Sequence, residues 1–183
     1  YSIEAYRAGR ERLAPGGLYA QWIALFQLSS EEFATIARTM AAVFPQLTLW
    51  RGNFRDTRPI ALLVGSVDAP PLDPDAVRAR LADGAGPDAA RAGPQFTDPA
   101  QVLLLYQGNL ASAPDTLGAG PIERDLRPRI EYRAAIAHRE KRAGRASALV
   151  GAEMVHLFER IFERVPPDSD PYLADVSPER RGL

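Results

Sequence analysis

The sequence predicts an α/β fold, and three stretches carry that prediction. The run Leu18–Phe26 is almost wholly apolar and aromatic, with Gln21 as its polar interruption, which is typical of a strand covered on both faces in a parallel sheet. Residues 29–44 have the spacing of an amphipathic helix. The apolar runs Leu47–Phe54 and Ile60–Val67 are joined by a short polar link, which favours an antiparallel pair of strands.

The elements before residue 68 have recognisable start and stop signals. Ser2 is a predicted N-cap with Glu4 in the first turn, and the Pro-Gly-Gly at 15–17 ends that first helix in a turn. Ser29 and Glu32 have the spacing of a capping box. The helix that follows presents a core-facing stripe, which consists of Phe33, Ile36, Ala37, Met40 and Phe44.

The chain beyond residue 67 is predicted to be mainly helical, with loops between the helices. Asp73-Pro74 and Asp98-Pro99 each place an N-cap before a proline, so each predicts a helix start, the first helix running to about Leu81. Residues 83–94 are predicted to be a loop. The second of these helices is expected to carry Val102, Leu103, Leu105, Tyr106 and Leu110.

The last third of the chain predicts one short extended segment and one strong helix. Residues 127–132 read as extended, and 147–165 as an amphipathic helix that Pro166-Pro167 ends. The apolar stripe of that helix consists of Val150, Met154, Leu157, Phe158, Ile161 and Val165. We therefore expect three regions: part of a sheet at 1–67, a helical appendage at 68–165, and a polar, poorly ordered tail at 166–183.

Composition excludes several classes of function. A net charge of −1 argues against a general nucleic-acid binder, and the absence of cysteine removes thiolate metal sites and cysteine nucleophiles. Only two histidines occur, which makes a histidine-based metal site improbable. No run approaches the ~20 apolar residues that span a bilayer. The chain opens at Tyr1-Ser2 without a methionine, so we expect it to be a piece of something longer.

The residues alone indicate little chemistry. The chain has no glycine-rich phosphate loop, nucleophile elbow or HExxH motif, so no catalytic or metal-binding residue is predicted. Gln21 is either a hydrogen-bonded structural amide or a ligand contact at the carboxyl end of its strand. The basic run at 138–145 is interpreted as a solvated link, with contact to an anionic group or lipid surface as the alternative.

The first fifty residues resemble a known family. The segments YSIEAY, LAPGG, a strand with Gln21-Trp22, the helix start SSEE, VFP and a strand ending in Trp50-Arg51-Gly52 follow one another as in the second half of spermidine synthase-like domains. In the bacterial branch that these segments resemble, this domain can be fused to a membrane transporter-like region. The resemblance extends more weakly to 123–133, where Asp125, Arg127 and Pro128 match the family's Asn-Thr-Asp-Asp-Arg-Pro motif.

The resemblance implies a partial Rossmann-like methyltransferase fold. It also implies that the parent protein transfers an aminopropyl group from decarboxylated S-adenosylmethionine to an amine, or uses S-adenosylmethionine instead. It implies substrate contacts at Gln21, Trp22, Asp125 and Arg127. The family's glycine-rich loop, ribose-binding acid and catalytic aspartate precede the part that this chain matches. By the resemblance, this chain is therefore a C-terminal portion that is inactive alone, holds no cofactor, and is cytoplasmic, with a membrane reached only through a fused region.

One physical consequence concerns partners. In the resembled fold the 18–26 strand pairs with a strand of the missing half, so its open edge here must be covered by that half, by a second copy, or by the helices after Pro99. Two other functions stay open beside the transferase portion. One is a degenerate half that acts as an interaction or dimerisation module, and the other is a regulatory domain of a membrane-fused protein.

Overall fold

A computed structural model describes residues 1–53, 55, 57–68, 71–83, 98–142 and 148–177 of the 183-residue chain. The strands are β1 (Tyr19–Ile23), β2 (Gln46–Arg51), β3 (Ala61–Ser66) and β4 (Tyr106–Asn109). The α-helices are α1 (Ile3–Arg10), α2 (Ser30–Ala41), α3 (Pro74–Asp83), α4 (Pro99–Leu103), α5 (Ile130–Arg142) and α6 (Ala152–Arg164). Short 3₁₀ turns are η1 (Leu25–Gln27), η3 (Pro114–Leu117), η4 (Pro167–Ser169) and η5 (Pro171–Leu173).

The four strands form one antiparallel sheet in the order β1-β3-β2-β4. The hairpin of β2 and β3 confirms the predicted antiparallel pair, with Leu49 opposite Leu63 in its register. Because β1 and β2 are both antiparallel to β3, they run parallel to each other, and α2 makes the crossover between them. The fold is therefore α/β, as predicted, but the described residues contain no parallel sheet.

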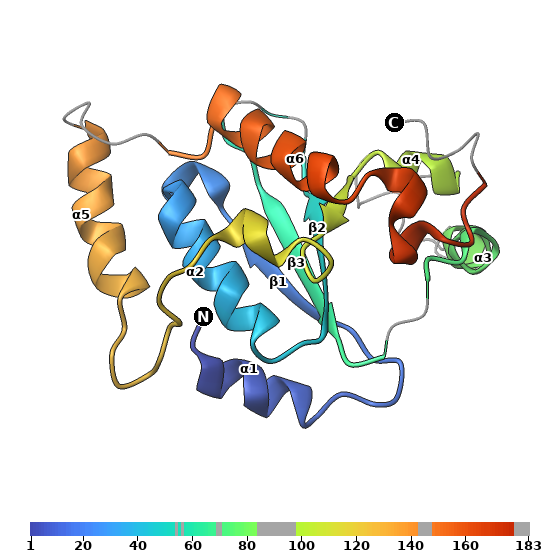
Figure 1. Cartoon of the computed structure of the whole chain (residues 1–183), viewed down its shortest axis with the longest axis horizontal. Coiled ribbons are helices and arrows are strands. Elements are labelled where there is room, and N and C mark those ends of the chain that lie inside the picture. Colours follow the sequence, from blue (N-terminus) through green and yellow to red (C-terminus); the bar gives the residue numbers. More distant parts are fainter. Residues whose placement is uncertain (54, 56, 69–70, 84–97, 143–147, 178–183) are drawn as a thin grey trace.

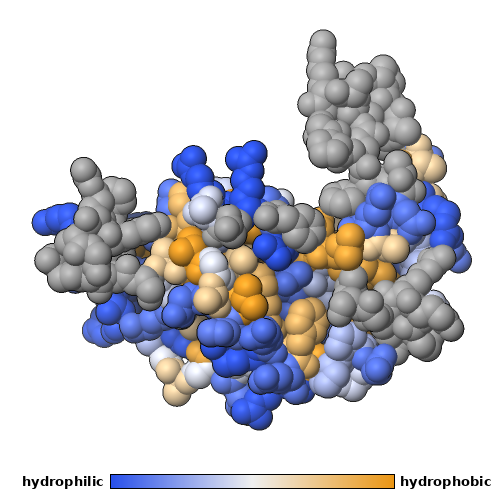
Figure 2. All heavy atoms as spheres, turned by 90° about the horizontal axis from the view of Figure 1, so that it is seen from above, coloured by the Kyte–Doolittle hydropathy of each residue, from blue (hydrophilic) through white to orange (hydrophobic). Residues whose placement is uncertain are grey.

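Helices cover the two faces of the sheet unequally (Figure 1). The larger core lies between one face and the helices α1, α2 and α6, and its fully buried members include Phe33, Met40, Leu49 and Ile161. This cluster contains the whole stripe predicted for α2 and most of the one predicted for α6, whereas Val150 lies before α6 and is only partly buried. Seen from above, apolar residues reach the surface in several separate patches between hydrophilic ones (Figure 2).

The smaller core lies on the other face and is built from aromatic rings. Trp50 packs edge-on against Tyr106 at 5.0 Å between ring centroids, and Tyr106 stacks on Tyr172 at 5.5 Å. Leu173 and Val176 complete this cluster and are each 1% exposed. The prediction that 166–183 is a poorly ordered tail is therefore wrong as far as Val176. The apolar residues of this segment cover the second face of the sheet. Residues 178–183 lie outside the described part.

A buried carboxylate fixes the same segment to β4. Asp170, 3% exposed, accepts hydrogen bonds from the Tyr106 hydroxyl at 2.5 Å and from Asn109 Nδ2 at 3.2 Å. It also accepts one from the Tyr172 backbone N–H at 2.9 Å. Three donors on one buried carboxylate satisfy most of its hydrogen-bonding capacity, so the segment is joined to the sheet by polar as well as apolar contacts.

Burial of the tyrosines predicts a loss of stability at alkaline pH. Desolvation, followed by the charge of Asp170, raises the pKa of Tyr106 well above its ordinary value of 10.0, and burial raises the pKa of Tyr6 and Tyr172 as well. A raised pKa in the folded state means that the stability it contributes is complete below about pH 10 and is lost as the pH rises beyond it. Urea unfolding at pH 8, 10 and 11 should show this fall. Tyr106→Phe should reduce it, and an unchanged pH dependence in that variant would contradict the assignment.

Local capping follows the sequence closely. The Ser2 hydroxyl accepts from the Ala5 N–H, and Ser29 and Glu32 form the predicted capping box at the start of α2. Asp73 accepts from the N–H groups of Asp75 and Ala76 at the start of α3, and Asp98 caps α4. The loop predicted at 83–94 falls, from residue 84 on, outside the described residues.

The predicted strand Leu18–Phe26 is shorter and more exposed than expected. It spans Tyr19–Ile23, lies at the edge of the sheet, and pairs antiparallel with β3. Leu18 is 58% exposed and Trp22 54% exposed, so the prediction of a strand covered on both faces in a parallel sheet is wrong. Its inner face packs through Tyr19 against Tyr6 and Phe44, whereas Ala20 and Trp22 on its outer face are exposed.

Three further predictions of local structure are corrected. The helix expected beyond Pro99 ends at Leu103, and the chain then enters β4 beside β2. Residues 127–132 are not an extended segment, because α5 begins at Ile130 and includes 138–142 of the basic run. The last helix starts at Ala152 rather than residue 147. The Leu149 N–H donates to the Leu28 carbonyl at 2.9 Å, so this part of the chain is not available for helix hydrogen bonds.

Among the helices after Pro99, α5 contacts η1, which follows β1 in the chain. The last of them, α6, packs on β4 and η3, at the opposite edge of the sheet. Within the described residues β3 is the strand that pairs with β1, so what covers its other edge stays a prediction. No described helix has both the length and the apolar character that crossing a bilayer requires.

Candidate functional site

The residues predicted to bind substrate fall into two separate places. Gln21 and Trp22 are neighbours on β1 and therefore point to opposite faces of the sheet. Gln21 is not the deeply buried amide that the sequence suggested, since it is partly exposed and its Nε2 donates to the Trp22 carbonyl at 2.9 Å. Trp22 lies on the more open face, beside the partly buried Leu62 of β3.

The second pair, Asp125 and Arg127, lies in an exposed turn between η3 and α5. The Asp125 N–H donates to Glu4 Oε2 of α1 at 3.2 Å, and Arg127 N–H closes the turn on the Arg124 carbonyl at 3.0 Å. Asp125 borders a small cavity of about 90 Å³. No described cavity, hydrogen bond or ion pair joins this pair to Gln21 or Trp22, so their shared role in substrate binding stays a prediction.

Glu123 has a structural role that the sequence did not indicate. It is 4% exposed, and its Oε1 accepts from the backbone N–H groups of Arg129 and Ile130, where α5 begins. Its own N–H donates to Thr39 Oγ1 of α2, and its carbonyl accepts from the Ile3 N–H of α1. One residue thus connects the first turns of α1 and α5 to the side of α2.

Glu123→Ala is expected to lower the free energy of unfolding by about 2–3 kcal/mol, because two helix-end N–H groups lose their acceptor in a buried place. Glu123→Gln keeps an acceptor oxygen there and should cost less. Urea unfolding of both variants checks this, with the exposed Glu131→Ala as the matched control. Equal losses for the alanine and glutamine variants would argue against the capping role.

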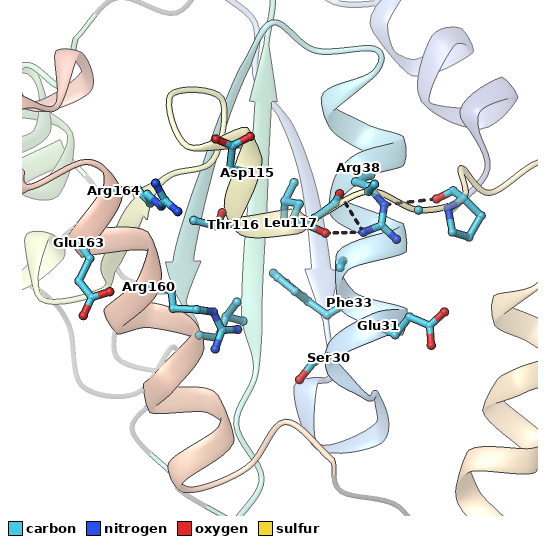
Figure 3. Close-up of a pocket in the computed structure, with 16 residues that line it drawn as sticks. Ser30, Glu31, Phe33, Arg38, Asp115, Thr116, Leu117, Arg160, Glu163 and Arg164 are labelled. Atoms are coloured by element: carbon cyan, nitrogen blue, oxygen red, sulfur yellow. Dashed lines mark hydrogen bonds between the residues drawn. The ribbon is translucent and has the colours of Figure 1, made fainter.

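A partly polar recess lies between α2, the 115–121 segment and α6, and we call it the α2–α6 cleft (Figure 3). Its volume is about 570 Å³, within the range of small-molecule sites. Its floor consists of Phe33, Leu117 and Leu157, each no more than 5% exposed. Its walls are polar, with Ser30 and Glu31 on the α2 side and Arg160 and Arg164 on the α6 side.

Arg38 holds the cleft together rather than serving as a free cation. Its guanidinium donates to the carbonyls of Leu117, Gly118 and Pro121 and to Thr35 Oγ1. The segment that closes the cleft between η3 and α5 is therefore fixed to α2 by this one side chain. A guanidinium with four acceptors around it has little capacity left for a ligand.

The other charges of the cleft differ in whether they are paired. Glu31 forms an exposed ion pair with Arg133 of α5, with 2.9 Å between the nitrogen and oxygen atoms. The side chains of Arg160 and Arg164 are exposed and make no hydrogen bond or ion pair with a described residue. Figure 3 shows Glu163 on the side of α6 away from α2, so its carboxylate does not lie between the arginines and the cleft. Neither arginine could be singled out from the sequence, because an i, i+4 pair on a polar helix face looks like any solvated face.

A second recess lies on the other face of the sheet, beside β1. This β1–α3 groove has a volume of about 680 Å³ and is mainly apolar, with Leu18, Leu72, Val77, Leu81, Val102 and Tyr172 along it. Together with the exposed Trp22, it makes the outer side of β1 an apolar surface. Surfaces of this kind next to an unpaired strand edge are typical of contact regions between proteins or domains.

The described residues contain no cluster of three or more histidine, aspartate or glutamate side chains placed to hold a metal ion. Comparison of the chain with family models, curated proteins and solved structures found no match.

Proposed function

We propose that this chain is the C-terminal portion of a spermidine synthase-like transferase. In that role it would supply the wall on the amine side and the lid of the site, while residues upstream would hold decarboxylated S-adenosylmethionine or S-adenosylmethionine. The chain alone would then be inactive. The proposal rests on the resemblance of residues 1–52 and on the arrangement of the first three strands.

The observation that carries the proposal is that one edge of β1 has no paired strand among the described residues. The resembled fold ends in a crossover helix and an antiparallel hairpin, and its strand at the position of β1 pairs with a strand of the upstream half. Here β1, α2 and the β2–β3 hairpin follow in that order, and the edge of β1 has no strand beside it among the described residues. Leu18 and Trp22 are more than half exposed beside that edge, as residues that await a partner would be.

The same edge favours a second candidate, an interaction or dimerisation module. The strand Tyr19-Ala20-Gln21-Trp22-Ile23 has no charged residue and no proline, and these are the features by which edge strands usually avoid pairing. An antiparallel pair of two β1 strands would satisfy the edge in a homodimer. Native mass spectrometry separates the two candidates, since a dimer that survives dilution supports the module and a monomer supports an edge that awaits upstream residues.

Hydrogen exchange provides the main test of the transferase proposal. In this chain the backbone amides of Tyr19–Ile23 that face outward should exchange quickly, and in a product of the reading frame that includes upstream residues they should be protected. The amides of β3 (Ala61–Ser66), which pair on both sides, are the internal control and should be protected in both samples. Equal exchange of β1 in the two samples would overturn the proposal.

Ligand binding is the second readout. Calorimetry with S-adenosylmethionine and with decarboxylated S-adenosylmethionine should detect binding to the longer product and none to this chain. Binding by this chain alone would contradict a nucleotide site that lies upstream.

A further inference from the structure

We propose that the α2–α6 cleft binds a small amphiphilic anion, a carboxylate or phosphate carried on a short apolar body. This proposal is independent of the transferase proposal. It rests on the unpaired arginines of α6, on the buried apolar floor between α2 and α6, and on the pairing of the acid on the opposite wall.

The arginines supply the anion contact. Arg160 and Arg164 are four residues apart on α6, so they share one face of the helix, and both border the cleft (Figure 3). Neither guanidinium has a partner among the described residues. Guanidinium groups form two parallel hydrogen bonds with carboxylate or phosphate oxygens, which makes this chemistry the best match for the pair.

The acids of the first turn of α2, on the opposite wall, both have partners: Glu31 pairs with Arg133, and Glu32 accepts from Ser29 in the capping box. Ser30 and Glu31 belong to the first turn of α2, a twelve-residue helix whose N-terminal end carries a partial positive charge. The negative charge of Glu31 is directed to Arg133 rather than into the cleft. Asp115 and Glu163 also border the cleft, and Figure 3 shows Glu163 turned away from α2.

The floor specifies the rest of the ligand. Phe33 and Leu157 come from α2 and α6, and Leu117 comes from η3, so apolar side chains from three elements line the same cleft as the arginines. The apolar body of a ligand would be removed from water when it lies on this floor, which favours binding. An inorganic anion has no apolar surface to bury and lacks this contribution. A volume of about 570 Å³ admits a ligand body of several carbon atoms.

Calorimetry with four probes tests the chemistry on the intact chain. Octanoate and octyl phosphate should bind, octylamine should not, and inorganic phosphate should bind at least about tenfold more weakly than octyl phosphate, since it lacks the apolar burial. Comparison of the two anions identifies which head group fits better. Equal binding of octylamine and octanoate would overturn the role of the arginines, and equal binding of the two phosphates would overturn the role of the floor.

Variants locate the site. The double variant Arg160→Gln/Arg164→Gln should weaken octanoate binding by about tenfold or more, because charge-assisted hydrogen bonds are lost. Arg139→Gln on the exposed face of α5 is the matched control and should bind as the parent does. Ala34→Phe, which fills the cleft from α2 and leaves both arginines, should also abolish binding. Circular dichroism and melting check folding, and unchanged binding in folded double and Ala34→Phe variants would refute the site.

Discussion

Asp170→Ala is expected to lower the free energy of unfolding by about 3–5 kcal/mol, since it orphans three donors in a buried place. The Tyr106 hydroxyl, Asn109 Nδ2 and the Tyr172 N–H all donate to this carboxylate. Without the carboxylate, these three donors either stay unpaired or bind water that enters between Tyr106 and Tyr172. Urea unfolding monitored by far-ultraviolet circular dichroism measures the loss.

Asp175→Ala is the matched control, because that side chain is exposed and lies only five residues further on. Its effect should stay within about 0.5 kcal/mol. Asp170→Asn keeps one acceptor oxygen and should fall between the two. If Asp170→Ala proved as mild as the control, the hydrogen-bonded connection between β4 and the 167–176 segment would contribute nothing measurable.

Gly108→Ala should cost about 2–4 kcal/mol, through strain and overlap together. Gly108 lies in β4 with a φ of +125°, a conformation that residues with a side chain rarely adopt, and a Cβ built there meets the Cγ2 of Ile161. The substitution must therefore move β4 or α6, which pack against each other. Thermal and urea unfolding of the variant give the magnitude.

Gly118→Ala separates the two causes, because Gly118 also has a positive φ, +63°, but open space around its Cβ position. It should cost only about 1 kcal/mol. Adding Ile161→Ala to Gly108→Ala should give a double variant less destabilised than the sum of the single ones. Strict additivity would mean that the contact with Ile161 is not the cause.

The elements that the sequence predicted are those whose signals are local. The capping box of Ser29 and Glu32 sets the start of α2 from residues three apart, and the short link between β2 and β3 makes their antiparallel pairing almost unavoidable. The apolar stripe of α6 likewise identifies its buried face.

The elements that the sequence missed depend on distant residues. Tyr106–Asn109 is a four-residue strand with little β pattern. It forms because β2 has an edge available for pairing, and because residue 108 is a glycine, which lacks the Cβ that would overlap Ile161. The start of α5 depends on Glu123, seven residues before Ile130. The apolar run at β1 was predicted as fully buried, because a strand that is buried and a strand exposed beside an apolar groove have the same composition.

The candidate site was the least predictable part. Arg160 and Arg164 become neighbours of Phe33 only when α2 and α6 pack on the same face of the sheet, and nothing within either helix indicates that meeting. Gln21 and Asp125, by contrast, were identified by resemblance to a family, and the geometry of this chain leaves them in different places.

The position of Val176 has a consequence for how the protein is made. Trp50 of β2 is synthesised more than a hundred residues before Val176, yet both belong to the same buried cluster, so one side of the sheet stays open to water while the ribosome completes the remainder. Folding of this face can finish only after residue 176 has left the exit tunnel. During that interval Trp50 and Tyr106 leave aromatic surface uncovered, so we expect synthesis at reduced temperature, or with added chaperones, to raise the yield of folded protein.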